Sequence, residues 1–334
     1  MKPFAPAEIK SILLVQLGPF GDVLLNTSYL NVLRRKFPHS RIDFLVSKPY
    51  DSVLYRHPAL DHIVSFPKKK GLAYVGERIR TFYRVWKNHY DLIIDQQCGT
   101  GSGQIVMFSH AKYRLGFENS KFAIFYNMVA SRGPKRYSAS TKFDVLAPLG
   151  IVEEPYELYY YVMPESREYI QTWLNENKLE DRSFVVFSPG SPAERKVWKL
   201  ENFARLADMI IENHNLKIVI LWAPDELKDA ERVISLMHHS AVLAPKTNLN
   251  QGAALLEHSR LLICNDGGIN HISVATKTPS LAMFGPTSPL HWCPGKVFPI
   301  HDSLSNPQAY TPEDKGFGIS VEEAYIKANN LLDL

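Results

Sequence analysis

Short apolar runs alternate with amphipathic stretches along the whole chain. The runs are continuous rather than alternating, as is typical of strands buried on both faces of a parallel sheet. In the first half they fall at Ser11–Leu17, Ile42–Val46, Ile63–Phe66 and Leu92–Asp95, and from Tyr113 to Phe117. In the second half they fall at Phe184–Phe187, Lys217–Leu221, Val242–Leu243, Leu261–Cys264 and Ser280–Phe284. This alternation predicts an α/β protein with doubly wound parallel sheets.

Helical spacing fills the intervals between these strands. The stretch from Val23 to Phe37 is amphipathic and ends in three basic residues, where the helix dipole favours cations. Further helices are predicted at Thr141–Leu149, Ser166–Lys178, Ile269–Thr276 and Val321–Leu332. The chain therefore opens with a strand, a helix and a second strand in one β–α–β unit.

The length of the chain indicates two domains. For 334 residues, a prior of about 150 residues per domain predicts two of them. The segment Gly150–Pro164 carries the chain out of the first domain. We expect a first domain at residues 1–160, a second at residues 161–318 and a C-terminal helix at residues 319–334.

Composition and charge narrow the classes of function. Hydrophobic residues make up 45% of the chain and charged residues 22%, which is ordinary for a globular protein. The net charge of +4 is too weak to indicate nucleic-acid binding. No apolar run approaches the roughly 18 residues that span a bilayer, and the N-terminus lacks a convincing signal peptide. Three cysteines without a pairing motif, Cys98, Cys264 and Cys293, favour reduced thiols in the cytoplasm.

Several well-known catalytic motifs are missing from the sequence. The glycines after the first strand are not spaced G-x-G-x-x-G and no P-loop is present, so nothing supports a dehydrogenase or a P-loop NTPase. No cluster of His, Cys and Asp has metal-ligand spacing, and the D-x-D motif is absent. We therefore expect no cofactor and no obligatory metal.

One turn carries the clearest chemical signal. It joins the strand at Leu261–Cys264 to the next helix and consists of Asn265, Asp266, Gly267 and Gly268. Free backbone N–H groups and the positive end of the helix dipole form a site for phosphate there. The glycines let a ligand approach the backbone closely. The simpler interpretation is that Asp266 caps the helix.

Three segments together resemble glycosyltransferase family 9, the bacterial heptosyltransferases of the lipopolysaccharide inner core. Residues 12–46, which begin ILLVQLGPFGD, look like the family's opening strand, Gly-Asp loop and helix. Residues 184–208, FVVFSPGSPAERKVWKLENFARLAD, are similar to its donor-phosphate loop. Residues 265–289 follow its N/D-D/T-x-G-x-x-H…F/Y-G-P-T/S-x-P pattern. The resemblance implies the GT-B fold, in which two Rossmann-like domains face each other across a cleft and a last helix crosses back to the first domain.

On the acceptor side, the resemblance implies that Asp22 is the general base. Such a base must lie within hydrogen-bond reach of the acceptor hydroxyl, opposite the leaving group if configuration inverts. Asp22 equally suits the N-cap of its helix. Acceptor contacts are expected at Gly18, Gly21, Gln97 and Gly99. For the glycine-rich loop that holds the last two, a flexible crossover turn is the alternative.

On the donor side, the departing diphosphate needs positive charge. Lys196 stands two residues before Trp198, as the family's phosphate-binding lysine does, and we assign it this catalytic role. Lys199, where the family commonly has proline, is the alternative. A charge run such as Glu194–Lys196 is otherwise typical of a solvated turn. Further donor contacts are expected at Ser188, Gly190, Ser191, Gly267 and Gly268.

Four more residues are assigned to the donor from the family pattern. Asp266 matches a position that contacts the donor sugar or orders the loop. Glu226, in preference to Asp225, is expected near the ribose diol. Thr287 is expected to donate to phosphate. His271 is a weaker site residue, since a lone histidine there is often a packing residue.

These assignments predict an inverting glycosyltransferase that moves a heptose from ADP-heptose to a lipopolysaccharide core acceptor. That acceptor is a lipid-anchored saccharide at the inner membrane, and no nucleic acid takes part. Two alternatives stay open. One is another GT-B enzyme such as a nucleotide-sugar epimerase, and the other is a non-catalytic protein that binds nucleotide sugars.

A basic amphipathic helix is predicted at Tyr74–Asn88, after the run Lys68–Lys70. Its apolar stripe consists of Val75, Ile79, Phe82 and Trp86. Such a helix can lie on an anionic membrane, although packing of the stripe on the protein's own sheet is the commoner case. The family's acceptor favours a cytoplasmic protein that visits the inner face of the membrane.

Overall fold

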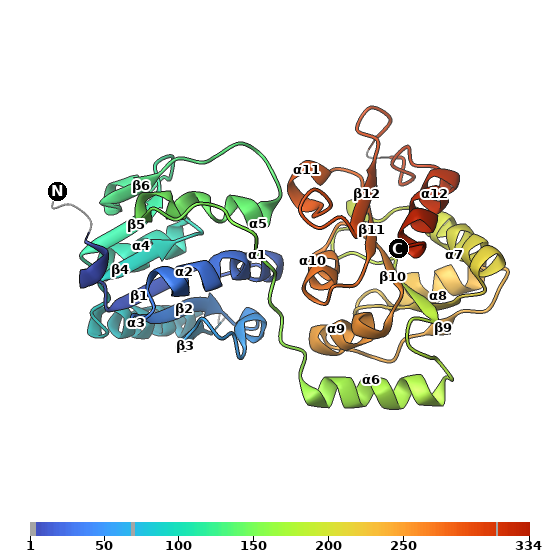
Figure 1. Ribbon diagram of the computed structural model, residues 1–334, viewed down its shortest axis with the longest axis horizontal. Helices are drawn as coiled ribbons and strands as arrows, with labels where there is room; N and C mark the ends of the chain where they lie inside the picture. Colours follow the sequence, from blue (N-terminus) through green and yellow to red (C-terminus); the bar gives the residue numbers. More distant parts are fainter. Residues whose placement is uncertain (1–4, 68–70, 312) are drawn as a thin grey trace. The chain divides into compact units, whose positions relative to one another are not determined.

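The computed structural model describes residues 5–67, 71–311 and 313–334. It divides the chain into two compact units, Met1–Tyr161 and Val162–Leu334. Each unit is a parallel sheet with helices packed against it (Figure 1). The predicted basic run Lys68–Lys70 lies outside the described residues.

The first unit is built on a six-stranded sheet in the order β3-β2-β1-β4-β5-β6. All of its strand pairs are parallel. The strands are β1 (Ser11–Val15), β2 (Arg41–Ser47), β3 (His62–Phe66), β4 (Leu92–Asp95), β5 (Tyr113–Phe117) and β6 (Met128–Ala130). The central strands are almost wholly apolar and buried, as their continuous apolar runs predict.

The helices of the first unit are α1 (Phe20–Leu25), α2 (Leu30–Lys36), α3 (Gly71–Lys87), α4 (Thr100–Phe108) and α5 (Ser138–Thr141). Short 3-10 helices lie at Pro6–Glu8, Asn26–Tyr29, Tyr50–Leu54, Ala123–Phe125 and Asp144–Leu149. The stretch predicted as one helix after the first strand is therefore two helices joined by the 3-10 turn Asn26–Tyr29. The Asn26 side chain donates to Asp22 O and the Thr27 hydroxyl to Leu24 O. Such local bonds compete with regular helix geometry.

The predicted glycine-rich loop after β4 is only partly a loop. The helix α4 begins at Thr100, with Gly99 as its N-cap. Gly99 N donates to Ser102 Oγ, 3.0 Å away, which fastens the first turn. Ile105 and Val106 are buried on the sheet. The flexible part is thus short, because apolar residues later in the segment anchor it as a helix.

The second unit repeats the same plan with the sheet order β12-β11-β10-β7-β8-β9, again all parallel. Its strands are β7 (Phe184–Ser188), β8 (Lys217–Ile220), β9 (Val242–Leu243), β10 (Leu261–Asn265), β11 (Ser280–Phe284) and β12 (His301–Ser305). Its helices are α6 (Pro164–Glu176), α7 (Leu200–His214), α8 (Leu227–Leu236), α9 (Leu249–His258), α10 (Gly268–Ala275), α11 (Pro289–Trp292) and α12 (Val321–Leu332), with a 3-10 helix at Glu194–Lys196. In Figure 1, α9 and α10 lie on one side of the sheet and α7 and α12 on the other.

The predicted C-terminal helix, α12, is packed in the second unit. Its apolar residues Val321, Ala324, Ala328 and Leu331 belong to that unit's hydrophobic core. The helix contacts α7 and the strands β10, β11 and β12. Among the described residues, no helix is long and apolar enough to cross a membrane.

The shared topology decides where a ligand belongs in each unit. The strand order reverses between β1 and β4 in the first sheet and between β7 and β10 in the second. In open α/β sheets, ligands bind outside the carboxyl ends of the strands at this switch point. The loops after these four strands are therefore the places to look for a site.

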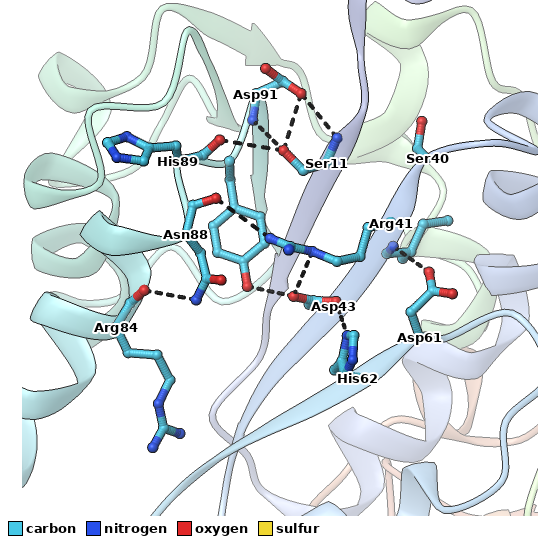
Figure 2. Close-up of polar contacts among 12 residues, drawn as sticks. Ser11, Ser40, Arg41, Asp43, Asp61, His62, Arg84, Asn88, His89 and Asp91 are labelled. Atoms are coloured by element: carbon cyan, nitrogen blue, oxygen red, sulfur yellow. Dashed lines mark hydrogen bonds and ion pairs between the residues drawn. The ribbon is translucent and has the colours of Figure 1, made fainter.

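A polar cluster lies at the opposite, amino-terminal end of the first sheet (Figure 2). The carboxylate of Asp43 accepts from Tyr90 Oη at 2.6 Å, lies 3.3 Å from Arg41 Nε and 3.1 Å from His62 Nδ1. The carboxylate of Asp91 accepts from the N–H and the hydroxyl of Ser11, 3.0 and 3.1 Å away. This cluster joins the ends of neighbouring strands on the side away from the switch point, so we assign it a structural role.

Candidate active site

In the first unit, the loops after β1 and β4 are tied together. Leu17 N donates to Gln97 Oε1 at 2.8 Å, and the Gln16 amide donates to Gly18 O at 2.8 Å. Gly18 has φ +138°, and a Cβ there would lie 2.5 Å from the Tyr50 ring. Only glycine satisfies both the backbone and the space at this position. Two of the predicted acceptor-contact residues, Gly18 and Gln97, therefore stand at the same switch point.

Asp22 is not the N-cap of its helix. The N-cap of α1 is Pro19, and Asp22 is the third helical residue, so the capping alternative is wrong. Its Oδ1 lies 2.8 Å from Lys142 Nζ, in an ion pair in which the side chains are 26% and 12% exposed. Gly21, the residue before it, lies in the first turn of the same helix. The geometry gives Asp22 a charged partner and leaves part of its carboxylate open.

Lys142 is the residue that sequence reasoning missed on this side. It follows α5 and is separated from Asp22 by 120 positions, and no local motif marks it. Its carbonyl accepts from the Gln96 amide at 2.8 Å. Lys142 therefore joins the helix after β1 to the loop after β4, and it lies beside the predicted base.

A buried carboxylate shapes the turn that carries Gln97 and Gly99. Asp95, fully buried at the end of β4, accepts from Gln97 N, Cys98 N and Tyr126 Oη at 3.0, 2.9 and 2.7 Å. Burial raises the pKa of Asp95, and the hydrogen bonds from Cys98 and Tyr126 oppose that rise. The turn is thus held by its own network rather than left flexible.

In the second unit, three predicted donor residues converge on one point. Lys196 Nζ lies 2.6 Å from Asp266 Oδ2, and the Thr287 hydroxyl donates to the same oxygen at 2.7 Å. Asp266 is buried at the end of β10, but it makes no capping bond to α10, whose N-cap is Gly267. The capping interpretation of Asp266 is therefore wrong. The hydroxyl hydrogen of Thr287 is directed at the carboxylate of Asp266.

The two candidate lysines lie in different places. Lys199 Nζ pairs with Asp314, 2.9 Å away, in an exposed ion pair. Between the two lysines, Trp198 is fully buried, and its indole N–H donates to Gly316 O at 3.0 Å. The buried Trp198 side chain separates the two lysines, and Lys196 is the one directed toward β10 and the loop after it.

Asn265 is a second residue whose importance the sequence did not reveal. It is buried at the end of β10, and its amide donates to Pro189 O at 2.6 Å. Its Oδ1 accepts from Trp198 N at 3.0 Å. One side chain therefore clamps the loop after β7 at two points, on either side of Lys196. A buried amide beside Asp266 was the available signal, since such groups need partners.

The remaining donor residues border the loop after β7. Ser188 ends that strand and is mostly buried, and Ser191 Oγ accepts from Ala193 N at 3.3 Å. A Cβ on Gly190 would lie 2.4 Å from the carboxyl group of Glu226, so these two residues touch. Burial raises the pKa of Glu226. Asp225, the alternative to Glu226, is exposed.

The glycine turn opens the helix α10, as predicted. The helix begins at Gly268, and a Cβ on Gly267 would meet only Asn265 O, at 3.9 Å. The backbone at Gly267 is thus open to a ligand. His271 is buried inside this helix, with its ring centroid 6.0 Å from that of Trp292, so it is placed as a packing residue near the site. No group of three or more His, Cys, Asp or Glu side chains in the described part of the chain could hold a metal ion.

Comparison with known proteins identifies the family. The family model described as "Glycosyltransferase family 9 (heptosyltransferase)" matches residues 78–314, well over half of the chain. The chain belongs to glycosyltransferase family 9. It is therefore a glycosyltransferase, and the family resemblance drawn from its sequence motifs is confirmed.

Individual relatives agree with this family 9 assignment. Lipooligosaccharide heptosyltransferase 2 of Haemophilus ducreyi is 27% identical over 301 residues, which cover 83% of this chain and 84% of that protein. A crystal structure of a family 9 glycosyltransferase from Veillonella parvula superposes with a TM-score of 0.86 at 24% identity, covering 97% of both chains. The E. coli heptosyltransferase WaaC with ADP-2-deoxy-2-fluoro heptose gives 0.73 at 18% identity, covering 96% of this chain and 99% of WaaC. These likenesses and the two six-stranded sheets show the predicted GT-B fold.

Proposed function

We propose that this family 9 enzyme transfers a heptose from ADP-heptose to a saccharide of the lipopolysaccharide core, with inversion at the transferred carbon. The first unit binds the acceptor and the second binds the donor. The family assignment supports the reaction class, and the relative WaaC holds an ADP-heptose analogue in its structure. The observation that carries the proposal is the placement of the Lys196 ammonium at the β7/β10 switch point, held by Asp266.

The donor is activated by charge around its leaving group. As the bond from the sugar to the diphosphate breaks, negative charge grows on the phosphate oxygens. Lys196 and the backbone N–H groups at Gly267 and Gly268 neutralise that charge. Asp266 holds the ammonium in position, and Thr287 fixes the carboxylate through its hydroxyl.

The loop after β7 and Glu226 hold the nucleotide. Ser188, Gly190 and Ser191 line the diphosphate, and Glu226, in contact with Gly190, accepts from the ribose hydroxyls. His271 supports the helix start from within α10. These donor roles follow from position at the switch point and from the family pattern.

The acceptor hydroxyl is activated by Asp22. Its carboxylate takes the proton as the hydroxyl oxygen attacks the sugar carbon on the face opposite ADP. Lys142 holds the carboxylate in position through the 2.8 Å ion pair. Gly18, Gly21, Gln97 and Gly99 border the path of the acceptor at the ends of β1 and β4. The acceptor is a lipid-anchored saccharide, so the enzyme works in the cytoplasm at the inner face of the membrane.

The first experiment combines calorimetric binding of ADP, UDP and GDP with release of ADP from ADP-heptose on a defined lipid A–Kdo acceptor. We expect selective binding of ADP and release that depends on the acceptor. Asp22→Ala should abolish release while ADP still binds. Product formed without acceptor would indicate an epimerase, and binding without any turnover would indicate a non-catalytic protein. Selective binding of UDP or GDP would overturn the donor assignment.

A further inference from the structure

The helix α3 carries an apolar stripe that faces away from the protein. The side chains in it recur at intervals of three and four residues, which places them on one helix face. Each is between 45% and 90% exposed. They are Leu72, Val75, Ile79, Tyr83 and Trp86. Isolated exposed apolar residues are ordinary, but a continuous stripe along a whole helix is not.

The side of α3 that packs on the sheet is a different one. Thr81 and Val85 are its buried residues. Phe82 packs against the core of the first unit and lies 5.3 Å from the Phe108 ring of α4, measured between centroids. Of the stripe predicted from the sequence, only Phe82 packs on the protein, whereas Val75, Ile79 and Trp86 are exposed. The helix therefore has enough apolar residues to cover its sheet and a second set that covers nothing in this unit.

Positive charge flanks the exposed stripe. Arg80, Arg84 and Lys87 are all exposed and follow one another at helical spacing beside it. Glu77 is the sole acidic residue between positions 71 and 87, and it pairs with Arg80 at 2.7 Å. The outward side of α3 is thus apolar along its middle and basic along one flank, which is the charge pattern that suits an anionic surface.

The residue after α3, Asn88, contacts both the last turn of the helix and the strand β2. The Asn88 amide donates to Arg84 O at 2.8 Å, and Asn88 O accepts from Arg41 Nη2 at 3.5 Å. Arg41 belongs to the polar cluster around Asp43, and Figure 2 shows the Arg84 side chain extending away from that cluster. The stripe is therefore presented by a helix that is already formed and packed on its unit, so little ordering is needed on binding.

We propose that α3 is a docking helix that lies on an anionic lipid surface. Its apolar stripe enters the boundary between headgroups and acyl chains, where Tyr and Trp side chains are favoured. Arg80, Arg84 and Lys87 contact lipid phosphates. Because the stripe runs along one face of the whole helix, α3, with 17 residues and a length of about 25 Å, lies in the plane of the surface. The inference deepens the proposed function, which requires an acceptor held in lipid, and it names the surface that brings the enzyme there.

The test uses the full chain and vesicles that contain neither donor nor acceptor. Sedimentation with vesicles of phosphatidylglycerol mixed with phosphatidylcholine should pull down the wild type, and pure phosphatidylcholine should bind much less. The double variant Ile79→Glu and Tyr83→Glu should weaken binding to the mixed vesicles at least about tenfold. Arg84→Gln with Lys87→Gln should weaken it by about fivefold for each charge removed.

The matched control replaces exposed apolar residues that lie off α3. Val152→Glu with Ile326→Glu adds the same charge at two exposed positions, one in the segment before α6 and one in α12, and should leave vesicle binding unchanged. Equal binding by the stripe variant and this control would overturn the inference. So would a wild type that ignores vesicles but forms a dimer that the stripe variant breaks, because the stripe would then bind a second copy of the chain.

A further pair of measurements separates this inference from the proposed function. In the stripe variant, calorimetric binding of ADP and transfer to a delipidated, water-soluble acceptor should equal those of the wild type. Transfer to an acceptor embedded in vesicles should fall with vesicle binding. Vesicle binding without any heptose transfer would overturn the proposed function and leave the docking helix standing.

Discussion

Lys142 Nζ lies 2.8 Å from Asp22 Oδ1, although the two residues are 120 positions apart in the chain. The pair joins α1, which follows β1, to the end of α5. Gln96, in the loop after β4, bonds the carbonyl of the same lysine. The predicted base is therefore positioned by a residue that also contacts the second loop of the switch point.

We expect Lys142→Met to lower kcat by roughly 10-fold to 100-fold, because a misplaced base loses much of its proton-transfer advantage. Affinity for ADP should stay unchanged, since the residues proposed to bind the donor lie in the other unit. Lys142→Arg keeps the charge and should restore part of the rate. Steady-state kinetics with calorimetry of ADP binding measures both. A lysine with a merely structural role would lower the melting temperature without this selective loss of kcat.

The two candidate lysines offer a matched comparison. Lys196→Met removes the ammonium beside Asp266 and should cost about 10²-fold to 10³-fold in kcat, as loss of a preorganised charge at a leaving group does. Lys199→Met breaks only a solvent-screened, exposed pair with Asp314 and should leave the rate nearly unchanged. Similar losses of kcat in both variants would contradict the assignment of the diphosphate to Lys196 in preference to Lys199.

Asn265 should affect donor binding although it is not itself predicted to touch the donor. Asn265→Ala leaves the carbonyl of Pro189 and the N–H of Trp198 without their partner, at a cost of about 1–3 kcal/mol in stability. Because the loop between them carries Lys196, donor KM should rise about tenfold even at temperatures where the variant is folded. Denaturant unfolding and donor titrations measure the two effects. A destabilised variant with an unchanged donor KM would limit Asn265 to folding.

The interior strands of the fold were predictable from the sequence, and so were the edge strands β3 and β9, whereas the edge strands β6 and β12 were not. The strand predicted at Leu261–Cys264 is β10 (Leu261–Asn265), because a strand buried on both faces must be apolar throughout. The strand β12 (HDSLS) was missed, since it lies at the sheet edge and only His301 in it is buried. In the first sheet, β6 is also an edge strand. It is three residues long and was missed for the same reason.

The candidate site was predictable only as far as local motifs reach. The motifs that resemble family 9 pointed to Asp22, Lys196 and Asp266 as site residues, and each of the three follows a strand that ends at a switch point. It could not decide between helix capping and an ion pair, since both use the same carboxylate. That choice depends on the contact of Asp22 with Lys142 in one unit and of Asp266 with Lys196 in the other, and both ion pairs arise from tertiary packing.

Two buried histidines predict a loss of stability in mild acid. Burial lowers the pKa of His57 to about 4 and that of His301 to about 4, with the charge of His271 adding to the second effect. His301 Nδ1 lies 2.8 Å from Ser280 Oγ inside the second unit, and His57 Nδ1 accepts from Ala59 N in the first. In the unfolded chain both rings take up a proton near pH 6.5, whereas the folded protein keeps them neutral.

The direction in which the free energy of unfolding changes with pH follows from that difference in bound protons. The full stability is present above about pH 6.5 and is lost as the pH falls toward 4, by about 2 kcal/mol for each histidine at pH 5. Urea unfolding at pH 7 and pH 5 measures the loss of stability. His301→Gln should reduce this loss in the second unit and leave the unfolding transition of the first unit unchanged. A variant whose second unit loses as much stability between these pH values as the wild type would show that His301 is not the group responsible.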